Sequence, residues 1–173
     1  MLTLTLGTGI GVGLCEDGRP FGNEPFIHLA GHVKVRTGGE YDCLDSEPCY
    51  CGMEGCFEST CSGTSLEKFV HDRLGPEVGN KELFARAATG EEAACEIVDW
   101  YLDMLCRALN QYVYLYCPDI IIIGGGVAKG LAPYEARLQD ALVAEVYEGQ
   151  RTEIRITQLK EDSGILGAAS LFA

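Results

Sequence analysis

Three cysteines and one histidine form the most specific chemical pattern in this sequence. Cys49, Cys51 and Cys56 lie in a C-x-C-x4-C arrangement that contains two turn-forming glycines, and His32 precedes them. Three thiolates and one imidazole complete the tetrahedral coordination of a structural Zn²⁺ and leave no open position for activating water. Buried cysteines without metal are the alternative, but so close a grouping is hard to place in a core. The spacing therefore predicts a closed, structural zinc site at these four residues.

Two glycine-rich segments, the first around Thr8 and the second at Gly124–Gly126, have the composition of nucleotide-binding turns. Without Cβ atoms, backbone N–H groups can approach a phosphate closely, and the hydroxyl of Thr8 adds a donor. A tight hairpin would explain the first segment equally well, and close helix–strand packing would explain the second. The sequence contains no G-x-x-x-x-G-K-[ST] motif, which excludes a P-loop enzyme. The candidate nucleotide-binding residues are Gly7, Thr8, Gly9, Gly11, Gly124, Gly125 and Gly126.

The composition fits one globular domain and disfavours two classes of partner. The 173 residues are 47% apolar and 23% charged, with a net charge of −13. No basic run is long enough to neutralise several phosphates of a duplex, so direct nucleic-acid binding is not expected. The apolar runs fall short of the roughly 20 residues that a membrane helix needs.

The odd number of cysteines, nine, and the metal-like grouping of three of them favour a reducing compartment over a disulfide framework. We therefore expect a cytoplasmic protein. Outside the predicted zinc site, most cysteines are best interpreted as small buried hydrophobes. Cys43, six residues before Cys49, is a possible competitor for the metal.

Apolar periodicity predicts strands that alternate with helices, and therefore an α/β domain. Aromatic residues of the longest predicted helix, from Trp100 to Tyr116, are interpreted as packing groups. Residues 33–48 show no period and are expected to form a loop. Strands are predicted at 2–6, 12–15, 120–123 and 153–157, and helices at 64–75, 80–90, 91–117, 133–149 and 163–172.

Taken in order, these motifs resemble those of the ROK family, named for its repressors, open reading frames and sugar kinases. The family signature runs from a glycine-rich turn through G-H to C-x-C-G-x-x-G-C-x-E and then S-G, which here ends at Ser62-Gly63. The resemblance implies an actin-like, ribonuclease H-like ATPase fold with two lobes. Residues 1–173 would form a single C-terminal lobe with a zinc-stabilised loop at 32–58, and the N-terminal lobe would be absent from this sequence.

The resemblance also assigns roles to the motifs. It implies that the turn around Thr8 contacts the phosphates of ATP, that Gly124–Gly126 contact the adenosine, and that Mg²⁺ accompanies the nucleotide. His32 and Glu58 would contact a hexose, with glucose-like or allose-like substrates expected. A surface carboxylate without a ligand is the alternative for Glu58. ROK proteins usually form homodimers through this lobe, so we expect one here.

Two departures from the family pattern argue against a kinase that works by itself. Leu29 stands where the family's E-x-G-H motif has a glutamate, so one acceptor for a sugar hydroxyl is missing. The D-x-G-G-T phosphate loop and the aspartate that acts as general base belong to the family's N-terminal lobe, and this sequence contains neither. No catalytic residue is therefore assigned in this chain.

Three functions are compatible with these motifs. The first is the C-terminal lobe of a longer ATP-dependent hexose kinase, which the intact glycine segments favour. The second is the sugar-sensing part of a ROK transcriptional regulator, for which the loss of the glutamate at Leu29 would be tolerable. The third is a non-catalytic lobe that exists as a dimer.

Overall fold

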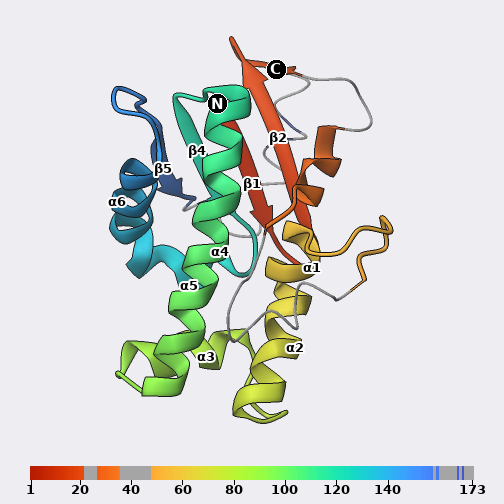
Figure 1. Cartoon of the computed structure of the whole chain (residues 1–173), viewed down its shortest axis with the longest axis vertical. Helices are drawn as coiled ribbons and strands as arrows, with labels where there is room; N and C mark the ends of the chain where they lie inside the picture. The colour runs from red at the N-terminus through yellow and green to blue at the C-terminus, as the bar shows by residue number, and fades with distance from the viewer. Residues whose placement is uncertain (22–26, 36–47, 158, 160–166, 168, 170–173) are drawn as a thin grey trace.

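The computed structural model describes residues 1–21, 27–35, 48–157, 159, 167 and 169. They build a five-stranded mixed sheet with helices packed beside it, which confirms the predicted α/β class (Figure 1). The strands lie in the spatial order β3-β2-β1-β4-β5. Their bounds are Leu2–Leu6 for β1, Ile10–Glu16 for β2, Arg19–Phe21 for β3, Ile120–Gly124 for β4 and Glu153–Ile156 for β5.

Strand β1 joins the antiparallel and parallel halves of the sheet. It pairs antiparallel with β2, so that Leu6 lies opposite Ile10 and the two predicted strands form a hairpin. On its other side β1 pairs parallel with β4, with Thr5 opposite Gly124. Parallel strands end at the same edge of a sheet, and open α/β sheets bind ligands beyond that edge. Both glycine-rich segments therefore lie at one edge of this sheet.

The helices flank the sheet, and the longest of them, α4, runs in front of β1 and β4 in the view of Figure 1. Buried side chains of β1, β4 and α4 belong to one continuous core. The helices, of which η1 and η3 are 3₁₀ helices, are η1 Ile27–His32, α1 Phe57–Cys61, α2 Gly63–Leu74, α3 Asn80–Ala88, α4 Glu92–Tyr116, α5 Ala128–Leu131, η3 Ala132–Tyr134 and α6 Glu135–Glu145.

Two buried tyrosines of α4 hold the segments that carry predicted site residues. The hydroxyl of Tyr101 donates to the carbonyl of Cys61 at 2.9 Å, at the end of α1, and that of Tyr112 donates to the carbonyl of Ala30 at 2.8 Å, in η1. The packing role predicted for the aromatic residues is wrong for Tyr114, whose side chain is 52% exposed. Two residues along a helix rotate a side chain by about 200°, so Tyr114 points away from the core that Tyr112 enters.

The N-cap of helix α2 lies two residues earlier than predicted. The sequence pattern places the cap at Thr64, whereas Ser62 has the extended backbone of an N-cap, and its hydroxyl accepts from the backbone N–H of Ser65 at 3.2 Å. A hydroxyl at the true N-cap satisfies one of the unpaired donors of the first turn. The helix ends before Gly75, whose φ of 107° is accessible to glycine, and this end agrees with the prediction.

Helix α6 is shorter than predicted, because the backbone becomes extended at Val146, ahead of Gly149. The helix predicted at 163–172, most of the predicted loop at 33–48, and Cys43 lie outside the described residues. Among the described residues, no helix combines the length and apolarity required to cross a bilayer.

Candidate functional site

The two glycine-rich segments are in direct contact at the edge of the sheet where β1 and β4 end. The backbone N–H of Val127 donates to the carbonyl of Leu6 at 3.1 Å, so the residues after β4 pack on the end of β1. The turn between β1 and β2 is closed by a hydrogen bond from the N–H of Gly7 to the carbonyl of Gly9 at 3.0 Å. Thr8 is exposed at the tip of this turn.

Close packing explains why position 125 is a glycine, but it does not explain the glycine at position 126. Gly125 has a φ of 95°, and a Cβ atom built there would lie 2.3 Å from the carbonyl oxygen of Leu6. Only glycine therefore fits at this position. A Cβ on Gly126 would meet no atom within 4 Å. Close packing thus accounts for Gly125, while Gly126 faces open space in which a ligand can approach the backbone.

The first residue of α2 packs directly on the glycine turn. The N–H of Gly63 donates to the carbonyl of Gly7 at 2.6 Å, and a Cβ atom on Gly63 would come within 2.8 Å of that oxygen. The S-G sequence thus places both the N-cap and the start of α2 beside the turn. A hollow of about 220 Å³ lies between these segments, and Thr8, Glu58 and Ser65 are among the residues that line it.

Glu58, in α1, lies against the glycine turn. Its Oε2 accepts a hydrogen bond from the backbone N–H of Ile10 at 2.9 Å. A Cβ atom on Gly9 would lie 3.1 Å from the same oxygen, so the small residue permits the approach. A carboxylate has about four acceptor positions, and the bond from Ile10 uses one of them. Glu58 can therefore hold the turn and accept from a ligand at the same time.

The structure brings together the four residues predicted to bind metal. The donor atoms of His32, Cys49, Cys51 and Cys56 all lie within 4.8 Å of one another. His32 Nδ1 is 3.4 Å from Cys49 Sγ, and Cys51 Sγ is 3.4 Å from Cys56 Sγ. Bond lengths of ~2.3 Å to sulfur and ~2.0 Å to nitrogen place tetrahedral donor atoms roughly 3.5–3.8 Å apart. The donor set and its spacing therefore fit a tetrahedral ion.

Backbone hydrogen bonds position the cysteines beside His32. The N–H of Val35 donates to the carbonyl of Gly55, and that of Phe57 donates to Val33, each at 2.8 Å. These two bonds flank Cys56, which is fully buried, and attach it to the residues that follow His32. Gly55 has a φ of 67°, which lets the chain turn just before Cys56.

The pKa values of the three thiols differ because their burial and their hydrogen bonds differ. Burial, followed by the hydrogen bond with Cys51, raises the pKa of Cys56 to about 12. Burial is also the main cause that raises the pKa of Cys49. The pKa of the exposed Cys51 is lowered, chiefly by a hydrogen bond from the backbone of Met53. A divalent cation would displace protons from the two buried thiols, since metal ligands must be deprotonated.

Tyr50 belongs to this site, although sequence reasoning did not select it. Its hydroxyl lies 2.8 Å from His32 Nε2, the ring nitrogen that does not face Cys49, and the two rings meet edge to face with centroids 4.9 Å apart. Desolvation, followed by the charge of Glu58, raises the pKa of Tyr50. Its position between Cys49 and Cys51 was the signal in the sequence, because a side chain between two predicted ligands lies at the rim of the cluster.

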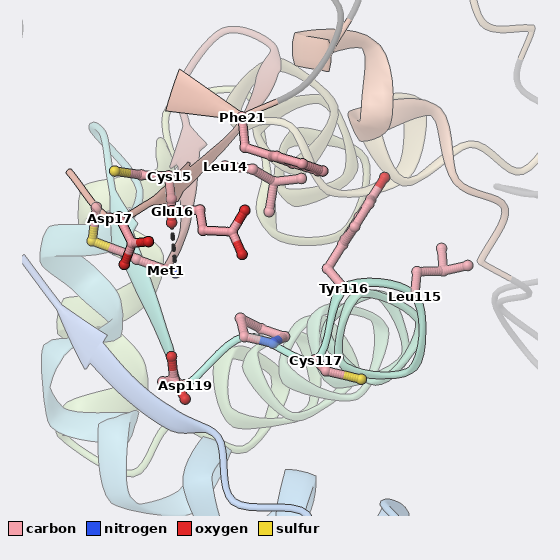
Figure 2. Close-up of a pocket in the computed structure, with 11 residues that line it drawn as sticks. Met1, Leu14, Cys15, Glu16, Asp17, Phe21, Leu115, Tyr116, Cys117 and Asp119 are labelled. Carbon is pink, nitrogen blue, oxygen red and sulfur yellow. Dashed lines mark hydrogen bonds between the residues drawn. The ribbon is translucent and has the colours of Figure 1, made fainter. Parts of the chain in front are cut away.

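A larger hollow, of about 420 Å³, lies at the opposite end of the sheet and contains none of the predicted site residues. Figure 2 shows Glu16 pointing into the space between the end of β2 and the C-terminal end of α4. Asp17 and Asp119 also line this hollow, whereas no Lys, Arg or His side chain is among its described lining residues. Its charge disfavours phosphates, so it is not a candidate nucleotide site.

The sequence as a whole matches the model of the ROK family over residues 1–173. The chain belongs to the ROK family. It is 33% identical over 190 residues to a glucokinase from Thermotoga maritima, covering 99% of this chain and 57% of that protein. It is 31% identical over 176 residues to the N-acetylgalactosamine kinase AgaK from a Shewanella species, covering 99% of this chain and 56% of that protein.

Solved ROK structures share the fold. A ROK hexokinase from Thermus thermophilus superposes with a TM-score of 0.81 at 29% identity, covering 97% of this chain and 55% of that one. A Streptomyces griseus ROK glucokinase in complex with glucose and AMPPNP has a TM-score of 0.78 at 23% identity, covering 98% and 59%. The mixed α/β sheet is thus that of the actin-like sugar kinases of this family. The chain spans about half the length of the curated relatives it matches.

Proposed function

We propose that this chain supplies nucleotide and sugar contacts to an ATP-dependent hexose kinase. The observation that carries the proposal is the hydrogen bond from Ile10 to Glu58, which joins the carboxylate of the C-x-E motif to the glycine turn. A kinase must hold a sugar hydroxyl and a phosphate next to each other, since phosphoryl transfer depends mainly on positioning and charge stabilisation. The similarity to a glucokinase and to an N-acetylgalactosamine kinase supports the same function.

The nucleotide would bind along the edge of the sheet. Thr8 and the glycines of the first turn, Gly7, Gly9 and Gly11, would contact the phosphates together with Mg²⁺. Gly124, Gly125 and Gly126 would line the adenosine, with Gly126 presenting exposed backbone and Gly125 holding the segment on β1. These different roles follow from the open space at Gly126 and the close packing at Gly125.

The hexose would bind at the hollow that Glu58 lines. Glu58 would accept from a sugar hydroxyl while its Oε2 remains bonded to Ile10. His32 would present its outer ring nitrogen, Nε2, to the same sugar. Leu29 offers no acceptor, and the loss of one neutral hydrogen bond corresponds to about 0.5–1.5 kcal/mol of binding free energy.

Zinc would hold the sugar-contacting residues in place. His32 Nδ1 and the thiolates of Cys49, Cys51 and Cys56 would complete its coordination, so no position is open for catalysis. Glu58 follows Cys56 by two residues and His32 would itself be a ligand, so both sugar contacts would depend on the metal. No residue of this chain is assigned as general base, and we expect binding without phosphoryl transfer by these 173 residues alone.

Equilibrium titration of the 173-residue chain tests this proposal. We expect Mg²⁺–ATP and a hexose each to bind, with the hexose affinity reduced in Glu58→Ala and the nucleotide affinity reduced in Thr8→Ala. Chromatography with light scattering on the same sample tests the expected homodimer. If neither ligand binds at millimolar concentrations, the proposal is refuted.

The sugar-sensing domain of a ROK regulator is the second candidate, favoured by the missing acceptor at Leu29. A ROK family transcriptional regulator also shares the fold, with a TM-score of 0.69 at 21% identity over 90% of this chain. The nucleotide titration separates the two, because a sensor needs the hexose but not ATP. A lobe that binds neither ligand and only dimerises would correspond to the third function considered above.

A further inference from the structure

The outer edge of His32 is already occupied in this structure. Of its two ring nitrogens, Nδ1 faces Cys49 Sγ at 3.4 Å, and Nε2 meets the hydroxyl of Tyr50 at 2.8 Å. A ligand that approaches Nε2 must therefore contact Tyr50 or displace it. The phenol stands where the sugar is proposed to bind.

The Tyr50 hydroxyl lies beside the edge of η1 at which Leu29 offers no hydrogen-bond acceptor. Leu29 precedes His32 by three residues in this 3₁₀ helix, and side chains three residues apart in such a helix lie one above the other. The two side chains consequently share one edge of the helix. The hydroxyl of Tyr50, in contact with His32 Nε2, brings to this edge a polar group that can both donate and accept.

The Tyr50 side chain stands on a fixed backbone and is held by its contact with His32. The turn that carries it is closed by hydrogen bonds from the N–H of Gly52 to the carbonyl of Cys49 at 2.8 Å and from the N–H of Cys49 to Met53 at 3.2 Å. The side chain itself is 77% exposed, and its described ring contact is the edge-to-face one with His32. Rotation of the phenol away from His32 Nε2 would break this contact and widen the hollow lined by Tyr50 and Glu58 without moving the loop.

We propose that Tyr50 is a specificity-determining residue of the sugar site, supplying a hydroxyl in place of the acceptor missing at Leu29 and forming the wall that faces His32. This inference rests on the proposed function. A sugar hydroxyl would fit against the phenol at this edge, whereas a bulkier substituent would have to displace it. The site is thus suited to an unsubstituted hexose rather than an N-acetylamino sugar.

Two substitutions separate the hydrogen bond from the steric wall. Tyr50→Phe keeps the ring and removes the hydroxyl, and we expect glucose to bind about 3–10-fold more weakly, the effect of one neutral hydrogen bond. Tyr50→Ala removes both, and we expect the ratio of N-acetylglucosamine affinity to glucose affinity to rise at least tenfold. Calorimetric titration of wild-type and variant chains with both sugars measures these changes.

Tyr147→Phe is the matched control, since Tyr147 is 75% exposed and follows α6. It should leave both affinities unchanged. Zinc per chain, measured by elemental mass spectrometry, should equal the wild-type value in every variant, because Tyr50 offers no metal ligand in this cluster.

The outcomes are distinguishable. If wild type binds hexose and both variants of Tyr50 bind it equally well, with the same preference, the role of Tyr50 is refuted and the proposed function stands. A loss of zinc in Tyr50→Phe would show a structural role and also overturn the inference. Absence of binding of any sugar to wild type would refute the sugar contacts of the proposed function and this inference with them.

Discussion

The carboxylate of Glu58 accepts a hydrogen bond from the backbone N–H of Ile10 at 2.9 Å, across 48 residues of sequence. The bond joins α1, which begins directly after Cys56, to the turn between β1 and β2. The C-x-E motif and the glycine-rich turn are therefore one structural unit.

Replacing Glu58 should loosen the turn. In Glu58→Gln the bond from Ile10 loses its charge, and the difference between charged and neutral hydrogen bonds is about 1 kcal/mol. For a domain of this size, that lowers the melting temperature by roughly 2–4 °C. Glu54→Gln makes the same charge change at an exposed position of the same loop and should melt like wild type. Equal melting of both variants, measured by calorimetry, would contradict the proposed importance of the contact.

Two neighbouring glycines should respond differently to alanine. Gly125→Ala forces a Cβ to 2.3 Å from the carbonyl of Leu6 at a φ of 95°, and we expect a loss of more than about 2 kcal/mol in the free energy of unfolding. Gly126→Ala meets no atom within 4 Å and should unfold near the wild-type denaturant concentration. Urea denaturation followed by circular dichroism tests the pair. Similar stabilities would mean that the packing on Leu6 is not as close as described.

The cysteine cluster should hold one zinc ion per chain. Cys56→Ser replaces a buried thiol with a poor ligand, so the zinc content should fall well below one per chain and the melting temperature should decrease. Cys117→Ser changes an exposed cysteine after α4 and should retain full metal content. Elemental analysis of both purified variants decides the matter. Zinc retained at the wild-type level by Cys56→Ser would remove this residue from the ligand set.

Zinc affinity should decrease as the pH is lowered. Burial raises the pKa of Cys56 to about 12 and also raises that of Cys49, so both thiols carry protons at neutral pH without metal. Because each must lose its proton to bind zinc, at least about two protons should be released per ion, and the affinity should change by about two orders of magnitude per pH unit. Calorimetry at pH 7 in buffers of different ionisation enthalpy counts the released protons. Binding without proton release would contradict the raised pKa values.

Local patterns in the sequence were sufficient to predict most of the elements. The apolar residues of β1 and β4 and the three- and four-residue periodicity of α4 predict the elements that are found, because hydrophobic burial selects one face of each. The cap of α2 was misplaced at Thr64, since several hydroxyl residues stand side by side there and only tertiary contact distinguishes them. Ser62 precedes Gly63, whose backbone must reach the carbonyl of Gly7, and this contact sets where the helix begins.

The sequence by itself predicted the candidate metal ligands from the spacing of Cys49, Cys51 and Cys56, and the four donor atoms do lie together. Only the tertiary structure decided that Glu58 binds Ile10 and that Tyr50 covers His32. Contacts between residues this far apart depend on how β1, β4 and α4 pack, and no local propensity encodes that geometry. The ligand set could thus be predicted from spacing, whereas the orientation of the residues around it required the fold.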